Sequence, residues 1–295
     1  MKSNSSKIIL VTVLLVINIF VWREIILTDR DSNILTVRFL DVGEGDAILV
    51  DDSYGNQILI DGGTGDNILE KLDKYLPFYD RTIEMIVLTH ADFDHLGGVL
   101  KALESYKVEN FLYSGIVLTG RSYQELINLL NKEKLKIIPA QLGQSVIFGN
   151  GASLNVLYPD ETVNGIEVEN ANEYSVVTKL IFNDFSLLLP GDAGRQLEAH
   201  LLNSGLNLKS DILKVSHHGS KYSTHPLFFI RTNPELAVIS VGENRYGHPT
   251  QEVLERLKDI LTLRTDLNGD VTIKTDGYKM NIITEKNSSI NEFAN

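Results

Sequence analysis

The sequence contains no cysteine. Disulfides, thiolate metal sites and cysteine nucleophiles are therefore excluded, and the redox compartment stays undecided because disulfide content is its usual indicator. Proline and tryptophan are also scarce, at 7 and 1 of 295 residues. The hydrophobic fraction of 43% is nevertheless sufficient for the core of one large domain or two ordinary ones.

Basic residues are in deficit as well. Lys+Arg number 27 against 39 Asp+Glu, which gives a formal net charge of −12. A chain this acidic has no general electrostatic attraction to nucleic acid or to an anionic membrane. Binding to either partner must therefore be local or depend on bound cations.

Long apolar runs are limited to one, from Ile8 to Trp22, interrupted by Thr12 and Asn18. Together with Ile25–Leu27 it approaches the roughly 20 residues that cross a bilayer as a helix. No small-x-small cleavage site follows, which favours an uncleaved anchor over a removed signal peptide. We therefore expect residues 1–27 to form a membrane anchor, followed by a polar linker at 28–33.

The region 34–285 reads as one domain, because no linker divides it. Short apolar strands joined in hairpins occur among single helices. This mixture predicts an α/β (α+β) fold in which two mixed β-sheets pack face to face, with helices on the outside. We expect the polar tail, 286–295, to be disordered.

The densest group of chemically active side chains follows the apolar run Ile83–Leu88, which predicts a buried strand. Imidazole and carboxylate groups there are the ligands expected for zinc, manganese or iron. Gly97-Gly98 predicts a break at which a helix opens, so we expect the ligands in a strand-to-helix loop. The four candidate ligands are His90, Asp92, Asp94 and His95.

Three further polar groups also follow apolar runs: Asp61, Asp192 and the pair His217-His218. Each alone would be read as an ordinary turn or loop. If the strand ends converge on one edge, as they do in other α/β sites, the loops together supply enough ligands for two metal ions.

The pattern His90-x-Asp92-x-Asp94-His95, with Asp61, Asp192 and His218, resembles the metallo-β-lactamase superfamily, whose usual signature is H-x-H-x-D-H. More narrowly, three stretches are similar to the hydrolase domain of ComEC, the DNA-uptake channel family: Phe39–Ala47, Lys214–Ser220 and Arg245–Pro249. Arg264–Asp270 continues the likeness. The resemblance covers about 34–283 and implies an αββα sandwich with a dinuclear metal site between the sheets.

The resemblance also implies which residues hold the two divalent ions. Asp94, His95 and His218 would hold one ion, His90 and Asp92 the other, and Asp192 would bridge both. Asp61 would orient ligand histidines from outside the coordination shell. Spacing does not settle which of His217 and His218 is the ligand; His218 is favoured for the metal and His217 for the substrate.

Two departures from the broad superfamily affect the metal. Asp92 stands where a histidine is usual, and no histidine lies between His95 and Asp192, where this chain has Asn172–Ser175. The His90/Asp92 position is therefore richer in oxygen, which makes manganese a candidate beside zinc. An enzyme with a single ion also stays open.

The resemblance implies a metal-dependent hydrolase, and we favour a phosphodiesterase or nuclease that uses a metal-bridging hydroxide. Asp94, His217 and His248 are the expected catalytic residues. The expected substrate contacts are Asn172, Ser175, Ser220 and Lys221. Single-stranded DNA is the candidate substrate.

We expect the hydrolase domain to be extracytoplasmic, either held at the membrane by the N-terminal helix or secreted if that segment is cleaved. With one apolar segment, the chain is not expected to transport DNA itself. Three alternatives stay open: a cell-envelope phosphodiester (phosphorylcholine-type) esterase, a lactone or β-lactam hydrolase, and a non-catalytic accessory of DNA uptake.

Overall fold

Two mixed β-sheets form the centre of the computed structural model, which describes residues 2–28, 33–286 and 290–294. The first sheet has the order β16-β15-β14-β1-β2-β3-β4-β5-β6. Its strands are β1 (Leu35–Phe39), β2 (Ile48–Asp52), β3 (Gln57–Ile60), β4 (Thr82–Leu88), β5 (Lys107–Tyr113), β6 (Ile137–Pro139), β14 (Val271–Thr275), β15 (Lys279–Thr284) and β16 (Ile290–Ala294).

The second sheet has the order β13-β12-β11-β10-β9-β8-β7. Its strands are β7 (Ser145–Ile147), β8 (Ser153–Tyr158), β9 (Val177–Phe182), β10 (Phe185–Leu189), β11 (Ile212–Lys214), β12 (Leu236–Ile239) and β13 (Leu261–Arg264). The helices are α1 (Lys2–Thr28), α2 (Asn67–Tyr75), α3 (Phe93–Ser105), α4 (Arg121–Lys132), α5 (Arg195–Asn203), α6 (Pro226–Thr232), α7 (Gln251–Leu257) and α8 (Thr265–Asn268). Single 3-10 turns lie at η1 (Asn172–Tyr174) and η2 (Ser216–Gly219).

The two sheets pack through an apolar layer to which alternate strand residues contribute. Val37 and Phe39 of β1 belong to the same buried cluster as Leu187 and Leu189 of β10, and all four are 1% exposed or less. Because side chains alternate across a strand, the other face of each sheet is free to pack against helices.

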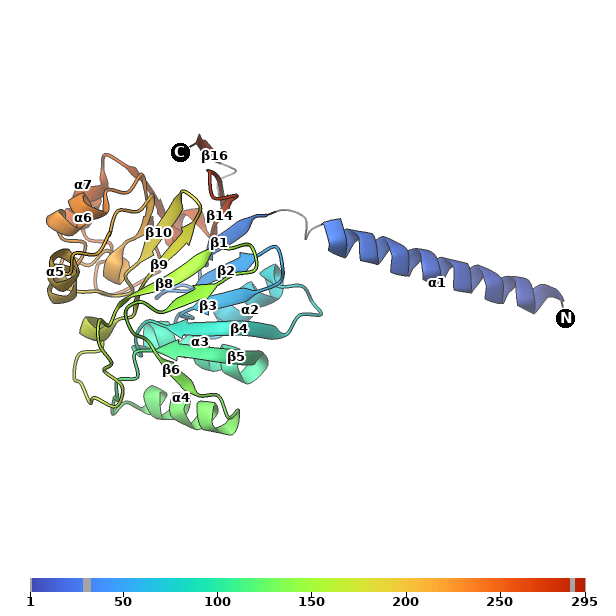
Figure 1. Ribbon diagram of the computed structural model, residues 1–295, viewed down its shortest axis with the longest axis horizontal. Coiled ribbons are helices and arrows are strands. Elements are labelled where there is room, and N and C mark those ends of the chain that lie inside the picture. The colour runs from blue at the N-terminus through green and yellow to red at the C-terminus, as the bar shows by residue number, and fades with distance from the viewer. Residues whose placement is uncertain (1, 29–32, 287–289, 295) are drawn as a thin grey trace.

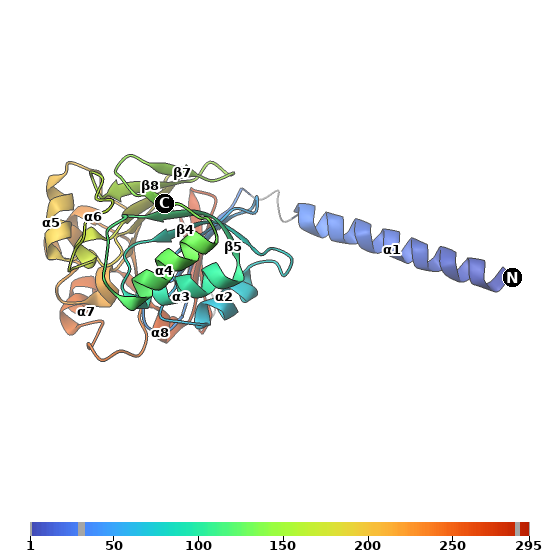
Figure 2. The same ribbon diagram turned by 90° about the horizontal axis from the view of Figure 1, so that it is seen from below.

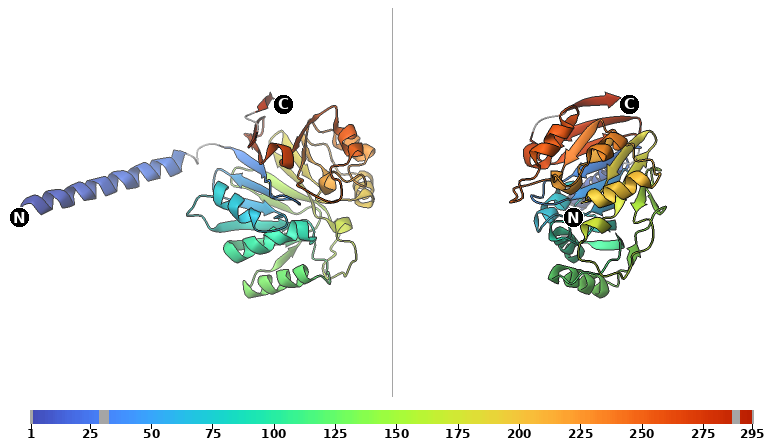
Figure 3. Two further views of the ribbon diagram at one scale, coloured as in Figure 1. Left: turned by 180° about the vertical axis from the view of Figure 1, so that it is seen from behind. Right: turned by 90° about the vertical axis from the view of Figure 1, so that its left-hand side faces the viewer.

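Helices cover both outer faces. The helices α2, α3 and α4 bury apolar residues against β3, β4 and β5, while α5 and α6 pack on β10 and β11, and α7 packs on β12. The layers are visible in Figure 1 and, after a quarter turn, in Figure 2. Figure 3 shows the same arrangement from behind and from the side. The predicted αββα sandwich is confirmed.

Parallel pairing sets the position of the functional loops. The strands β3 to β6 are parallel neighbours in the first sheet, and β10 to β13 are parallel neighbours in the second. Parallel strands bring their carboxyl ends to the same edge, where ligands bind in open α/β sheets. The loops after β3, β4, β10 and β11 therefore meet at one end of the sandwich.

The expected helix break at Gly97-Gly98 is wrong, because α3 already begins at Phe93 and runs through both glycines. They are needed for close packing: a Cβ on Gly98 would lie 1.9 Å from the Gly62 oxygen, and one on Gly97 2.3 Å from the Thr64 oxygen. The helix can therefore approach the loop after β3 directly. As a result, Asp94 and His95 sit on the first turn of α3 and not in a loop.

The N-terminal segment forms the continuous helix α1, drawn extended away from the sheets in Figure 1. Its described side chains from Ile8 to Trp22 are exposed, and its two polar interruptions hydrogen-bond within the helix, Thr12 to Ile8 O and Asn18 to Leu14 O, each at 2.9 Å. The prediction of a spanning helix is not supported, because among the described residues no helix combines the length and hydropathy needed to cross a membrane. Most of the expected linker, 29–32, lies outside the described residues.

The expectation of a disordered tail also needs correction. Ile290–Ala294 forms β16, which pairs antiparallel with β15. The edge of β15 would otherwise present unpaired backbone donors and acceptors, and a short added strand satisfies them. Residues 287–289 and 295 lie outside the described part of the chain.

Candidate metal centre

Four acidic and imidazole side chains converge where the two sheets meet. Asp94 and His95 come from α3, Asp192 from the loop after β10, and His218 from the loop after β11. One ligand atom from each lies within 4.8 Å of the others. The ring nitrogen His218 Nε2 is 3.3 Å from Asp94 Oδ2 and 3.4 Å from Asp192 Oδ2, and His95 Nε2 is 3.4 Å from Asp192 Oδ1.

The second ring nitrogen, Nδ1, of His95 and of His218 forms a hydrogen bond with a specific partner. Asp61 Oδ2 lies 2.8 Å from His95 Nδ1, and the Ser240 carbonyl lies 2.9 Å from His218 Nδ1. Both partners are acceptors, so each Nδ1 carries the hydrogen and donates it. Each Nε2 therefore points into the centre, and in the neutral ring it carries the lone pair that a metal ion would bind. Asp61 thus contacts His95, one of the histidines predicted to bind a metal ion.

Thr89 extends this network to His90. Its backbone N–H and hydroxyl donate to Asp61 at 2.8 and 2.6 Å, and its hydroxyl oxygen lies 3.0 Å from His90 Nδ1. Since the hydroxyl hydrogen is directed to Asp61, the oxygen accepts from His90 Nδ1. The Nε2 atom of His90 then carries no hydrogen, and its lone pair is free to bind a metal ion.

These inward-facing atoms fit a metal ion. Among the described residues, Nε2 of His90, His95 and His218 and Oδ1 of Asp192 are buried without a hydrogen-bond partner. Buried polar groups are almost always paired, and several converging orphans require an explanation. Two imidazoles and two carboxylates suit zinc or manganese, and the partners on Nδ1 are those of metal-bound histidines.

Three more of the predicted site residues, His90, Asp92 and His217, lie close to these four. His90 Nε2 is 3.7 Å from Asp92 Oδ2 and 3.9 Å from Asp192 Oδ2, while His217 Nε2 is 3.7 Å from the same Asp192 oxygen. Asp192 Oδ2 is thus within 4 Å of His90, His217 and His218, so Asp192 lies near residues of both predicted metal positions, and its bridging role stays a prediction. Both His217 and His218 face it, with only His218 close to Asp94.

The loop that carries the two histidines has an unusual backbone. His217 and His218 both adopt left-handed conformations, with φ of 50° and 52°, and Gly219 follows at 86°. Such conformations cost a non-glycine residue about 1–2 kcal/mol each and tend to occur at functional sites. Here the left-handed turn directs both imidazole rings toward Asp192.

The protonation of the metal-free site follows from its charges. Burial opposes a charged His218, yet Asp192 and Asp94 raise its pKa to about 10. Burial alone would raise the pKa of Asp192, but His218 and His95 hold it well below the usual range. For His90, burial and the neighbouring His95 lower the pKa well below its usual value. A metal ion must therefore displace a proton from His218.

Comparison with known proteins agrees with this geometry. Residues 40–140 match the metallo-beta-lactamase superfamily. The ComE operon protein 3 of Bacillus subtilis is 31% identical over 255 residues, which cover 80% of this chain and 32% of that protein. The chain belongs to the metallo-β-lactamase superfamily. The resemblance to ComEC proteins is confirmed at the same time.

Two further relatives of this metallo-β-lactamase domain carry names from DNA biology. Competence protein ComA of Neisseria gonorrhoeae is 28% identical over 247 residues, 81% of this chain and 32% of that protein. Recombination protein 2 of Haemophilus influenzae is 30% identical over 228 residues, 74% of this chain and 26% of that protein. The chain thus spans about a third or less of the length of these relatives.

Among solved structures, CmlA of Streptomyces venezuelae, a diiron β-hydroxylase, superposes with a TM-score of 0.51 at 12% identity. The match covers 82% of this chain and 54% of that chain. Likeness at this level of identity concerns the fold alone. Together with the ligand set, the metallo-β-lactamase fold supports a metal-dependent hydrolase.

The metallo-β-lactamase centre contains two residues to which the sequence analysis gave no role. Asp46 and Lys214 are both 1% exposed, and the Lys214 ammonium contacts the Asp46 carboxylate. Lys214 Nζ also lies 3.5 Å from Asp192 Oδ1 and donates to the Gly191 carbonyl at 3.0 Å. A lysine inside the apolar strand β11 was the available signal, because a buried lysine requires a counter-charge.

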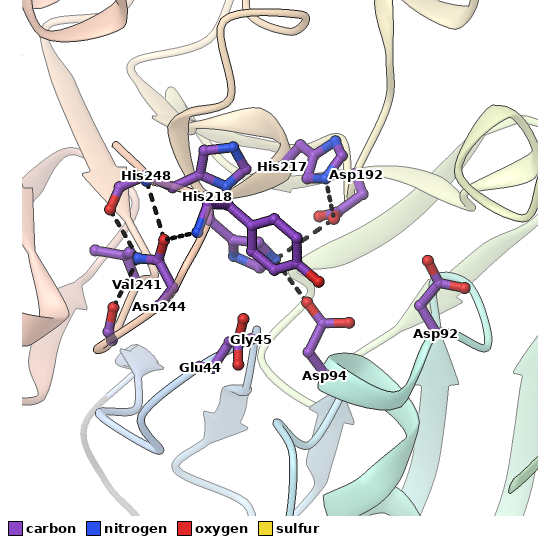
Figure 4. A pocket seen from close by; sticks show the side chains of 12 residues that line it. Glu44, Gly45, Asp92, Asp94, Asp192, His217, His218, Val241, Asn244 and His248 are labelled. Carbon is purple, nitrogen blue, oxygen red and sulfur yellow. Dashed lines mark hydrogen bonds and ion pairs between the residues drawn. The ribbon is translucent and has the colours of Figure 1, made fainter. Parts of the chain in front are cut away.

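A cavity of about 180 Å³ opens onto the centre of this metallo-β-lactamase domain (Figure 4). Its walls include predicted site residues from both metal positions and from the loop after β12. They are Glu44, Gly45, Asp92, Asp94, Asp192, His217, His218, Val241, Gly242, Asn244, Tyr246 and His248. Gly45 is required there, because a Cβ would lie 1.7 Å from the Asp94 carbonyl oxygen.

The four expected substrate contacts do not line this cavity as far as the structure describes the chain. Ser175 is fully buried and its hydroxyl accepts from the Asp192 N–H at 3.3 Å, while the Ser220 hydroxyl accepts from the Tyr222 N–H at 3.3 Å. Lys221 lies 5.1 Å from the ring of Tyr222, and Asn172 begins η1. Ser175 and Ser220 thus support the loops, and substrate contact by these four residues stays a prediction.

Proposed function

We propose that this metallo-β-lactamase domain is a metal-dependent phosphodiesterase that cleaves DNA. The observation that carries the proposal is the ligand set around Asp192. Among the described residues, three buried histidine nitrogens there have no hydrogen-bond partner, and Asp92, Asp94 and Asp192 line the adjoining cavity. Such a set fits two divalent ions. When bound, two adjacent ions lower the pKa of water and stabilise the anionic oxygens of a phosphodiester.

The chain's own residues support this chemistry in three ways. Asp192 Oδ2 lies 3.9 Å from His90 Nε2 and 3.4 Å from His218 Nε2, so its carboxylate could contact ions at both predicted positions. Asp61 and the Ser240 carbonyl hold the rings of His95 and His218 in one orientation, which reduces reorganisation on binding. The outer wall of the cavity presents His248 at the same opening.

His248 is suited to contact the substrate. Burial and the nearby His217 lower its pKa, so its imidazole is neutral near pH 7. A neutral imidazole has one N–H, which can donate to a phosphate oxygen during in-line displacement. The His217 and His248 rings lie 5.6 Å apart at 78°, close enough to contact one phosphate together.

DNA is proposed as the substrate because the matched relatives are named for competence and recombination. The oxygen-rich His90/Asp92 position favours manganese at one site, while the two-imidazole position accepts zinc. Both metal assignments are part of the proposal.

We also propose that the domain works outside the cytoplasm, where DNA would be met during uptake. The apolar run Ile8–Trp22 supports this location if it acts as an export signal. A fusion of alkaline phosphatase to the C-terminus tests this, because that reporter folds only where its disulfides form: activity in intact cells is expected, and a full-length fusion without activity would contradict it.

The function is tested with the full chain in mild detergent, stripped of metal and reloaded with manganese or zinc. Cleavage of bis(p-nitrophenyl) phosphate should require metal and be lost in Asp94→Asn without loss of folding. Asp259→Asn, an exposed carboxylate just past α7, is the matched control and should retain turnover.

Full turnover in Asp94→Asn would refute the ligand assignment. Stoichiometric metal binding without phosphodiester cleavage would refute the phosphodiesterase and direct attention to carboxyl esters or lactones. A chain that binds no metal would leave the non-catalytic accessory as the remaining interpretation.

A further inference from the structure

The metal cavity continues into a second groove. This groove, of about 750 Å³, is lined by Phe93, Arg121 and Tyr123 among others, and it shares Asp92 with the metal cavity. Figure 4 shows Asp92 and His248 on opposite sides of the metal pocket. A chain-like substrate lying over the metal ligands would therefore extend past Asp92 into the groove in one direction and past His248 in the other.

An exposed aromatic ring lies on each of these two sides. Phe93 lines the groove and is 56% exposed, and Tyr246 lines the metal cavity and is 66% exposed. Exposed aromatic faces beside a phosphodiester site are the means by which proteins bind unpaired bases, because every base offers a π-face.

The loop that carries Tyr246 is preorganised by hydrogen bonds. The Asn244 side chain accepts from the N–H groups of Tyr246 and His248 at 3.1 and 3.0 Å and donates to the carbonyls of Gly242 and His248 at 2.9 and 2.8 Å. The Tyr246 ring stacks on the His248 ring with centroids 5.7 Å apart and an interplanar angle of 26°. The outer tyrosine therefore has a fixed place relative to the metal ligands.

The Phe93 side is equally tied to the centre. Phe93 stands between the ligands Asp92 and Asp94 as the first residue of α3. The Asp92 carbonyl accepts from the N–H groups of His95 and Leu96 at 3.0 and 2.8 Å, which fixes this first turn. Movement of Phe93 would move two ligand carboxylates with it.

The negative net charge of the protein favours contacts with a nucleic acid that do not depend on charge. At a net charge of −12 the chain repels a polyanion, and Glu44 and Asp92 add negative charge at the cavity. Affinity for a nucleic acid cannot then come from displaced counter-ions in the way it does for basic proteins. Stacking is independent of this repulsion.

We propose that Phe93 and Tyr246 are base-stacking platforms on either side of the metal centre, and that they restrict the substrate to single-stranded nucleic acid. A duplex would have its base faces covered by neighbouring base pairs and could not use either ring. The cleavage of such a strand rests on the function proposed above, but the binding of its bases does not.

The first test measures binding without catalysis. The probe is a fluorescent octathymidine with methylphosphonate linkages, which carries no backbone charge, and the protein is the metal-free full chain. Phe93→Ala and Tyr246→Ala should each weaken binding roughly 5- to 160-fold, the range found when a stacking side chain is truncated. Phe93→Trp and Tyr246→Phe, which keep a ring, should stay close to the parent affinity.

The matched control is Phe78→Ala. Phe78 is an 80% exposed phenylalanine in the turn before β4, so its truncation should leave binding unchanged. Equal affinities for Phe93→Ala, Tyr246→Ala and the control would overturn the proposal. So would failure of the parent protein to bind the probe.

The second test separates base recognition from hydrolysis. For the metal-loaded enzyme, the ratio of kcat/KM for octathymidylate to kcat/KM for methyl p-nitrophenyl phosphate should fall in both alanine variants. An unchanged ratio would overturn the stacking role even if hydrolysis is intact. A preference of the parent enzyme for p-nitrophenyl phosphorylcholine would also overturn it, since these rings would then bind a quaternary ammonium. If none of these phosphodiesters is cleaved, the proposed phosphodiesterase function is refuted. The binding test with the uncharged probe then still decides whether Phe93 and Tyr246 stack on bases.

Discussion

The buried pair Lys214–Asp46 makes a strong prediction about stability. Both side chains are at most 2% exposed, and Oδ1 of Asp46 has no hydrogen-bond partner among the described residues. Lys214→Met removes the ammonium while keeping the volume, so Asp46 and Asp192 lose the lysine that contacts both and retain only the nearby imidazoles of His95 and His218. Breaking one partner of a buried pair costs roughly 3–5 kcal/mol, because the remaining charge stays buried and uncompensated.

A second substitution should restore much of this loss. In Lys214→Met/Asp46→Asn the charge at position 46 is removed as well. The double variant should therefore lose less unfolding free energy than the two single variants together, by about 2 kcal/mol or more. Urea unfolding of the metal-free protein, followed by circular dichroism, measures all four free energies. At a typical m-value of about 2–3 kcal/mol/M, the single Lys214→Met variant should lower the midpoint by roughly 1–2 M.

Lys258→Met is the control, because its partner Glu255 and its own side chain are both more than half exposed. An exposed pair of this kind contributes about 0–1 kcal/mol. If Lys214→Met costs no more than Lys258→Met, or if the two single losses add in the double variant, the proposed internal counter-ion is refuted.

Three further predictions follow from the same structure. Asp61→Ala should weaken metal binding about 10- to 100-fold, as measured by competition with a chelator, because His95 loses the carboxylate that orients its ring. Unchanged affinity would show that Asp61 does not orient a metal-binding histidine. The pKa of metal-free His218 is raised to about 10, so metal binding at pH 7 should release a proton and the affinity for metal should increase toward pH 10. Calorimetry in two buffers of different ionisation enthalpy measures this release. A heat of binding that does not depend on the buffer would contradict it. Burial raises the pKa of Glu198 from 4.5 to about 7, so the folded state favours its neutral form. The contribution of Glu198 to stability should be complete below pH 4.5 and fall by about 3 kcal/mol as the pH rises to 7. Glu198→Gln should reduce this fall, as measured by urea unfolding across that range, and an unchanged pH dependence would exclude Glu198 as its source.

The location of the site could be predicted from sequence because it depends on local patterns. Asp61, Asp192 and His218 follow apolar runs, and strand ends that face the same way bring such residues together regardless of the details of packing. The hairpins were equally accessible, since each consists of two short apolar runs around a turn.

The parts that sequence analysis missed depend on contacts between distant segments. Gly97-Gly98 looked like a break, and only the proximity of Gly62 and Thr64 explains why a helix contains both. The role of Lys214 could be seen only once Asp46, in the loop between β1 and β2 of the other sheet, was known as its neighbour. The strand β16 satisfies the edge of β15, and a polar segment gives no periodic signal for such a pairing.

The placement of the ligands on both sheets gives a metal ion the effect of a covalent cross-link. Asp94 and His95 belong to the half built on the first sheet, whereas Asp192 and His218 belong to the second. A chain without cysteine cannot fasten these halves with a disulfide, but an ion bound at 1,000 times its dissociation constant would stabilise the folded state by about 4 kcal/mol. Removal of metal should therefore lower the unfolding temperature and, in the same step, loosen one sheet from the other.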